Sequence, residues 1–147
     1  MATVTDPKIA EAYENVRSNS DETTWMILDY ESDKSDTLTL TSTGTGNLEE
    51  FASKLEPGHA SFGYIRVTYK NDDHSSREKF CLVIWIGEQV KVMRRAKVSV
   101  HTADVKRVLK AYSIEVSAST KGDLQEKDIV SRLRKAGGAN YNRSDFD

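Results

Sequence analysis

The sequence contains very little cysteine, proline or histidine, and it has no long apolar run. Its 147 residues include one Cys, two Pro and three His. A single cysteine excludes an internal disulfide, and Cys81 lies in the most apolar stretch, so we expect a buried, unreactive thiol. No apolar run approaches the ~20 residues that a membrane-spanning helix requires. The first residues have neither the basic nor the apolar part of a signal peptide. We therefore expect a cytoplasmic protein, and a monomeric one.

The residues that enzymes and metal sites use are also sparse. His59, His74 and His101 are scattered and have no metal-ligand spacing, and none lies near the cysteine. The Gly44-x-Gly46 pair lacks the third glycine of a dinucleotide loop, and no phosphate-binding GxxxxGK[ST] run occurs. The paired carboxylates fall in expected turns or on solvated helix faces. We predict no enzymatic activity, no metal and no cofactor.

The rest of the composition is that of an ordinary soluble domain. Hydrophobic residues make up 37% of the chain and charged residues 30%, which is enough for a proper core at this length. The length also favours a single domain. We place that domain at residues 1–138. Residues 139–147 are polar apart from Tyr141 and Phe146, and we expect them to form a flexible C-terminal tail.

The most apolar stretch runs from Phe80 to Ile86 and predicts a central strand. Seven consecutive residues are apolar, and β-branched and aromatic side chains dominate, which favours a strand over a buried helix. A strand with one face in water would alternate apolar and polar residues. Because this stretch is apolar on both faces, we expect other layers to pack above and below it.

Apolar periodicity and turn residues predict four helices and five strands. The expected strands cover residues 24–30, 37–41, 61–70, 77–86 and 112–118. The expected helices begin at Asp6-Pro7, with Asp6 as N-cap, at a cap on Asn47, in the segment after residue 90 and at Gly122-Asp123. The last helix is expected to end at Gly137-Gly138. Hairpins followed by one helical connection indicate a mixed, largely antiparallel sheet with helices on both faces.

Residues 91–110 form a strongly basic segment directly after the central strand. They hold seven basic residues and one acid, a local net charge of +6, whereas the whole chain has a net charge of −2. A solvated helix face would explain such a run of charge. A cationic surface for an acidic partner explains equally well why the rest of the chain is acidic.

The basic segment contains two apolar stripes that conflict with each other. The first stripe is Val92, Met93, Ala96, Val100 and Ala103, and the second is Val105, Val108, Leu109 and Tyr112. At ~100° per residue they lie on roughly opposite sides, so one straight helix cannot bury both against one sheet. Either the helix kinks near residues 98–102, or a second helix begins there with Thr102 as its N-cap. With the first stripe buried, Lys91, Arg94 and Arg95 point outward and are available to a partner.

Three stretches resemble a known family. They are KFCLVIWIGE at residues 79–88, RRAK at 94–97 and KAGGANY at 135–141, and the likeness extends over essentially the whole chain. Together they resemble the actin-depolymerising factor homology family. The resemblance implies an α+β fold, a single domain with a central, mixed, mostly antiparallel five-stranded sheet sandwiched by helices on both faces. In that family the basic segment is one long helix, which favours the kink over a second helix.

The resemblance also implies binding to filamentous actin, mainly through the long helix, with a lysine at a strand start as a key contact. In this sequence those positions are Lys79, with Arg77 beside it, and Arg94, Arg95 and Lys97. Lys91 joins them as the remaining cation at the beginning of the basic segment. Actin is acidic, so the implied partner agrees with the charge of the segment.

Two departures from the family pattern indicate a particular branch. Depolymerising members have a Lys-x-Lys-Met pattern where this chain has Arg94-Arg95-Ala96-Lys97, and the start Ala2-Thr3-Val4 lacks their regulatory serine. The sequence resembles the branch that binds filament sides and hinders capping without severing filaments. We therefore expect a protein of the cytoplasm and cytoskeleton.

Two other interpretations of the basic segment remain open. It could meet nucleic-acid phosphates, although the net charge of −2 and the lack of an exposed aromatic pair on a strand speak against this. It could instead dock a second protein or an acidic lipid, as in an adaptor.

Overall fold

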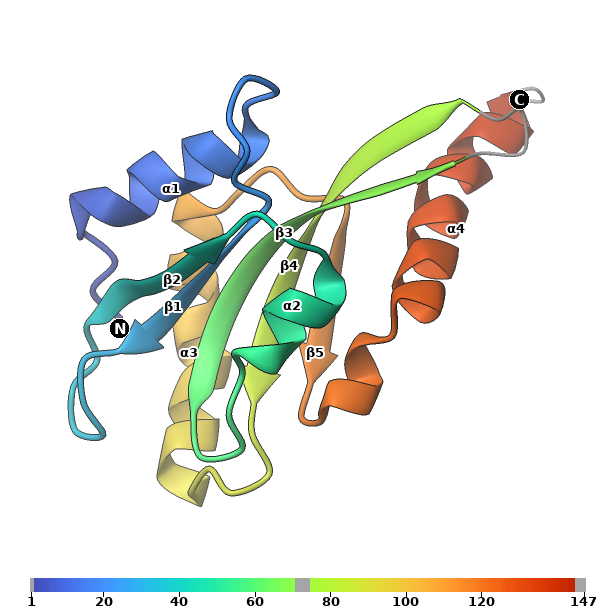
Figure 1. Ribbon diagram of the computed structural model, residues 1–147. Helices are drawn as coiled ribbons and strands as arrows, with labels where there is room; N and C mark the ends of the chain where they lie inside the picture. Colours follow the sequence, from blue (N-terminus) through green and yellow to red (C-terminus); the bar gives the residue numbers. More distant parts are fainter. Residues whose placement is uncertain (1, 71–74, 145–147) are drawn as a thin grey trace.

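The computed structural model describes residues 2–70 and 75–144, with only the backbone described for residues 137–144. The elements in chain order are α1 Pro7–Arg17, β1 Trp25–Tyr30, β2 Leu38–Gly44, α2 Leu48–Ser53, β3 Ala60–Lys70, β4 Ser76–Ile86, α3 Val92–Val108, β5 Ile114–Ala118, the 3₁₀ turn η1 Lys121–Leu124 and α4 Glu126–Ser144 (Figure 1). No described helix has the length and apolar character needed to cross a bilayer.

The five strands form one sheet in the order β2-β1-β3-β4-β5. β1 pairs antiparallel with β2 and β3, and β3 pairs antiparallel with β4. β4 and β5 are parallel, because α3 carries the chain back across the sheet between them. The predicted mixed, mostly antiparallel five-stranded sheet is confirmed.

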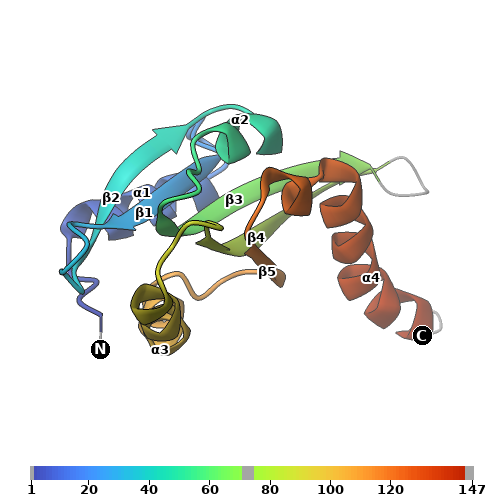
Figure 2. The same ribbon diagram turned by 90° about the horizontal axis from the view of Figure 1, so that it is seen from below.

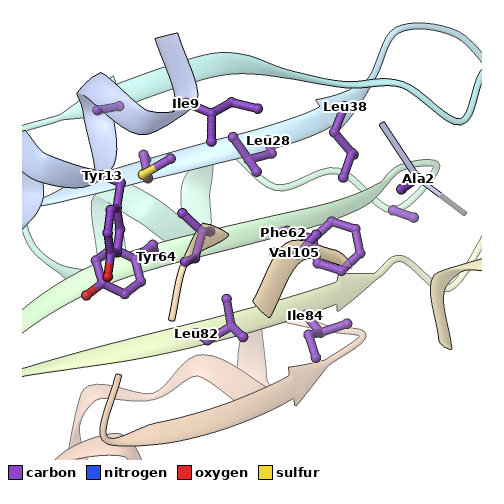
Figure 3. Packing of buried hydrophobic residues seen from close by; sticks show 14 of the residues in the cluster. Ala2, Ile9, Tyr13, Leu28, Leu38, Phe62, Tyr64, Leu82, Ile84 and Val105 are labelled. Carbon is purple, nitrogen blue, oxygen red and sulfur yellow. The ribbon is translucent and has the colours of Figure 1, made fainter. Parts of the chain in front are cut away.

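Helices cover both faces of the sheet, as predicted (Figures 1 and 2). On one face, α1 and α3 enclose an apolar cluster that includes Tyr13, Phe62 and Val105 (Figure 3). On the other face, α2 and α4 enclose a second cluster around Trp25 and Phe51. β4 contributes alternate residues to both clusters, which explains why its sequence is apolar on both sides. Cys81 is buried in the second cluster, and burial raises the pKa of its thiol to about 12.

Helix capping follows the sequence closely at the first two helices. The Asp6 side chain accepts a hydrogen bond from the Lys8 N–H, and Pro7 occupies the first helical position. The Asn47 side chain accepts one from the Glu50 N–H at α2, as the sequence predicts. The Glu50 carboxylate accepts hydrogen bonds from the Gly46 N–H and from the Trp25 indole N–H, so it connects α2 to β1.

The last helix departs from its predicted boundaries at both ends. Its expected start, Gly122-Asp123, lies in η1, and α4 begins at Glu126 after an extended Gln125. The predicted end at Gly137-Gly138 is wrong, because α4 continues to Ser144. A glycine weakens a helix by about 1 kcal/mol but ends it only where the backbone turns left-handed. The flexible tail at residues 139–147 stays a prediction, and residues 145–147 lie outside the described chain.

The outer part of the β3–β4 hairpin extends beyond the sheet (Figure 1). β1 pairs with β3 only over Ser61–Ile65, and β5 pairs with β4 only over Cys81–Trp85. In the described chain, Val67–Lys70 and Ser76–Lys79 therefore pair with each other and with no third strand. We call these eight residues the outer ribbon.

Candidate functional site

α3 is one uninterrupted helix, and of the two stripes predicted to be buried it buries only the second, Val105, Val108, Leu109 and Tyr112. Its inward residues recur at spacings of four, three, four and four, namely Arg94, Val98, His101, Val105 and Leu109. The first stripe faces solvent, namely Val92, Met93, Ala96, Val100 and Ala103. No second helix begins at Thr102, whose hydroxyl donates to the Val98 carbonyl one turn earlier. The two stripes need no kink to reconcile them, because only one is buried.

The inward face of α3 is polar at positions where the sequence pattern suggested exposure. His101 is buried, and its Nδ1 lies 2.7 Å from the Tyr30 hydroxyl. Asp104 is buried as well, and its carboxylate accepts hydrogen bonds from the Ala2 N–H at 2.9 Å and from Arg107 at 2.7 Å. The backbone hydrogen bond from Ala2 is the main cause of the lowered pKa of Asp104. Burial lowers the pKa of His101, so the neutral imidazole is favoured.

Arg94 points into the protein, although it was expected to point outward. Its guanidinium donates to three carbonyls of the β1–β2 connection, those of Ser32, Asp33 and Ser35, at 2.6–3.3 Å. It also lies 3.5 Å from the Asp36 carboxylate, and only 13% of its side chain is exposed. Arg94 therefore clamps this connection to the first turn of α3. Its place in a binding site stays a prediction.

The other cations at the start of α3 differ in how free they are. Arg95 donates to the carbonyls of Val90 at 2.9 Å and Glu88 at 3.0 Å, so it holds the loop that leads into the helix. Lys97 lies 3.4 Å from the Asp36 carboxylate and keeps 45% of its side chain exposed. Lys91 is exposed and makes no ion pair or side-chain hydrogen bond within the described chain.

Lys79 and Arg77 belong to a different surface from the α3 cations. Lys79 has the same strand parity as Cys81, which packs in the cluster of α2 and α4, whereas α3 covers the opposite face. The outer ribbon and the beginning of α3 lie at opposite ends of the molecule (Figures 1 and 2). Within the described residues, Lys79 and Arg77 make no ion pair and no side-chain hydrogen bond. The six predicted residues therefore form two surfaces rather than one.

The outward face of α3 carries the largest exposed apolar side chains that the structure describes. Val92 is 79% exposed, Met93 74% and Val100 62%. We call Val92, Met93, Ala96, Val100 and Ala103 the outer stripe. An open groove of about 450 Å³ adjoins it between Met93, Lys91 and the loops at Ser32 and His59. A cluster of exposed apolar side chains on one helix face is typical of a protein-binding surface.

Sequence reasoning found the outer stripe but assigned it to the core. The signal that could have corrected the assignment is weak: the outer stripe has two alanines and no large aromatic residue, whereas the inward positions include Val98, Val105 and Leu109. Arg94 contacts Tyr30 and Asp36. Both come from the β1–β2 region, and no local sequence pattern connects them to α3.

Comparison with known proteins gives a consistent result over nearly the whole chain. The family model for cofilin/tropomyosin-type actin-binding proteins matches residues 1–134. Coactosin from Dictyostelium discoideum is 35% identical over 142 residues, which is 96% of this chain and 95% of that protein. The crystal structure of human coactosin-like protein superimposes with a TM-score of 0.82 at 27% identity, covering 92% of this chain and 99% of that one. Mouse coactosin, described as an actin filament binding protein, gives a TM-score of 0.75 at 30% identity, with 97% of each chain covered.

Proposed function

Because this chain belongs to the family of cofilin/tropomyosin-type actin-binding proteins, we propose that it binds along the sides of actin filaments without depolymerising or severing them. We further propose that it counteracts capping of filament ends and acts at the cytoskeleton in the cytoplasm. The full-length similarity to coactosin supports this branch of the family. Membership of a family of actin-binding proteins agrees with the prediction that the chain is not an enzyme.

The single observation that carries the proposal is the outer stripe of α3. Large apolar side chains at 62–79% exposure are costly in water, and a protein partner that covers them gains their burial. Arg107, with 68% of its side chain exposed, lies beside the outer stripe, so the surface combines an apolar centre with a cationic edge. This combination favours an acidic protein over a nucleic acid, which would leave the apolar side chains uncovered.

The separation of the two cationic surfaces supports a filament as the partner. The outer stripe lies on α3 and Lys91 is the N-cap of this helix, whereas Lys79 and Arg77 lie on the outer ribbon at the far end of the molecule (Figure 1). A filament presents neighbouring subunits at fixed spacing, so both surfaces can be engaged at once. Two linked contacts raise the overall affinity far above that of either one.

The departure at residues 94–97 supports binding without depolymerisation. Ala96 and Lys97 are exposed on α3, at positions where the depolymerising pattern has Lys and Met. Arg94, at the first position of that pattern, is committed to the β1–β2 connection. The exposed chemistry of this turn therefore differs from that of the depolymerising members.

Filament co-sedimentation tests the proposal, with Val100→Asp as the informative variant. The charge falls in the middle of the outer stripe, and Val100 is 62% exposed, so filament binding should fall severalfold with little change in stability. Ala10→Asp is the matched control, since it adds the same charge at an exposed position of α1. Wild-type protein that stays in the supernatant at all filament concentrations would refute the proposal. A severalfold faster disassembly of diluted filaments would refute the non-depolymerising part.

A further inference from the structure

The outer ribbon needs support from outside the sheet. Val67–Lys70 and Ser76–Lys79 form a two-stranded segment, and a lone two-stranded hairpin is marginally stable in water. Lys79 lies in the pair of this segment nearest the sheet, opposite Val67. Any motion of the outer ribbon therefore moves the cation that the proposed filament contact depends on.

One arginine holds the base of the outer ribbon from the α1 side. The Arg66 guanidinium donates to the carbonyls of Val16 at 3.0 Å, Ser18 at 3.2 Å and Thr23 at 2.8 Å. These carbonyls come from the end of α1 and the loop that follows it. Arg66 therefore fixes β3 at the residue before the outer ribbon begins, but it does not reach the ribbon's far end.

A second arginine reaches the far end from α4. The Arg134 guanidinium donates to the Lys70 carbonyl at 2.6 Å, and its central carbon lies 5.7 Å from the centre of the Tyr69 ring. Val67 and Tyr69 are buried in the same apolar cluster as Ile129 and Leu133 of α4. α4 therefore holds the outer ribbon in two ways. Its apolar residues pack against Val67 and Tyr69, and Arg134 adds a charge-assisted hydrogen bond at the last residue of β3.

We propose that Arg134 is a positioning residue for filament binding: it pins the outer ribbon to α4 and so holds Lys79 in place for its acidic partner on actin. The part of this proposal that concerns actin binding rests on the proposed function. The pinning of the outer ribbon to α4 does not, because it can be measured without actin. A cation on a rigid base loses less conformational entropy on binding than one on a mobile ribbon. Loss of Arg134 should therefore weaken the contact that Lys79 makes.

Arg132 provides a closely matched control. It lies on the same helix, carries the same charge and is also exposed, and it donates to a backbone carbonyl, that of Glu115 in β5, at 2.9 Å. Its partner strand is paired within the sheet rather than in the outer ribbon. Arg132→Gln and Arg134→Gln therefore remove equal charge and one comparable hydrogen bond, and they differ in which strand is released and in the contact of Arg134 with the Tyr69 ring.

The first experiment needs no actin and measures amide hydrogen exchange by NMR. Arg134→Gln should speed exchange about five-fold or more at Val67–Lys70 and Ser76–Lys79, while β1 and the inner half of β4 keep their protection. Arg132→Gln should leave the outer ribbon unchanged. Unchanged exchange in the outer ribbon of Arg134→Gln, or an even loss over the whole sheet, would overturn the inference.

The second experiment is a double-mutant cycle in filament co-sedimentation, run at low salt and high filament concentration so that the weakened Lys79→Ala variant still binds measurably. We expect Arg134→Gln to weaken binding about five-fold in the wild type, but less than about two-fold in the Lys79→Ala background, because positioning matters only while Lys79 is present. Losses that multiply fully would mean that Arg134 contacts actin itself, and they would overturn the inference. If Lys79→Ala binds like the wild type, the assignment of Lys79 under the proposed function fails instead, and the exchange result still decides whether Arg134 pins the ribbon.

Discussion

Tyr30 of β1 lies directly beneath Arg94 of α3, with the guanidinium carbon 3.8 Å from the centre of the phenol ring. The Tyr30 hydroxyl lies 2.7 Å from Nδ1 of His101, which is about two turns further along the same helix. Burial raises the pKa of Tyr30 to about 12, so it stays a neutral hydrogen-bonding group. One tyrosine therefore connects the sheet to α3 at two points and fixes the helix that carries the outer stripe.

Arg94→Ala should destabilise the fold by roughly 1–3 kcal/mol. The variant loses the stacking on Tyr30 and leaves the carbonyls of Asp33 and Ser35 without their charged donor. Urea unfolding measures the effect, and Lys97→Ala, an exposed neighbour with one ion pair, should change stability by less than about 0.5 kcal/mol. A variant that is as stable as the wild type yet fails to bind filaments would show that Arg94 acts as a contact residue.

Lys79→Ala should abolish or greatly weaken filament binding and leave the fold intact. Its removal leaves an acidic group on actin without its partner, at a cost of ~2 kcal/mol or more if that contact is buried. The folding cost should be within about 0.5 kcal/mol, because Lys79 makes no ion pair within the described residues. Lys70→Ala is the control, since Lys70 lies on the same ribbon with the opposite strand parity. Lost binding together with a lowered melting temperature would indicate a structural role instead.

Filament binding should weaken as the salt concentration rises, without vanishing. Lys79 is half-buried, Lys91 and Lys97 are exposed, and salt screens the attraction of such charges to actin beyond ~10 Å at 0.1 M ionic strength. The outer stripe adds an apolar contribution that salt does not screen. Co-sedimentation between about 0.05 and 0.2 M salt measures the slope. Binding that is flat over this range would assign the interface to the apolar residues alone.

Stability should decline on acidification below about pH 6.5, the ordinary pKa of histidine in an unfolded chain. Burial lowers the pKa of His101 in the folded state, so over this range the unfolded chain binds more protons than the folded one. The contribution of neutral His101 is complete above pH ~6.5 and is lost as the pH falls toward its folded pKa.

Urea unfolding at pH 7.5 and pH 5.5 of the wild type, His101→Gln and His59→Gln tests this expectation. His101→Gln should flatten the dependence, whereas His59→Gln should not, because the His59 side chain is 56% exposed. An equal loss of stability in all three proteins would assign the acid sensitivity to other groups.

The sequence by itself determined the elements and the layers of the fold. Phe80–Ile86 is apolar on both faces because β4 has helices above and below it, and this follows from local composition alone. The N-caps at Asp6 and Asn47 could be predicted from the sequence, because an N-cap involves only its own side chain and the backbone N–H of a residue two or three positions later. The family resemblance rested on three local stretches and is confirmed by a family match over residues 1–134.

Tertiary structure alone decided which face of α3 is buried and which cations are free. Two apolar stripes compete for the sheet, and periodicity describes their spacing but not which of them meets Phe62 and Tyr64. Arg94 turns inward because its acceptors lie in the β1–β2 connection. These acceptors are 58–62 residues earlier in the chain, so no local sequence pattern connects them to Arg94. Lys79 and the α3 cations are near neighbours in sequence, yet they lie on different faces of the sheet. Side chains alternate between the two faces along β4, which places Lys79 on one of them, and the crossover to β5 places α3 on the other. Long-range packing therefore divided one predicted site into two surfaces.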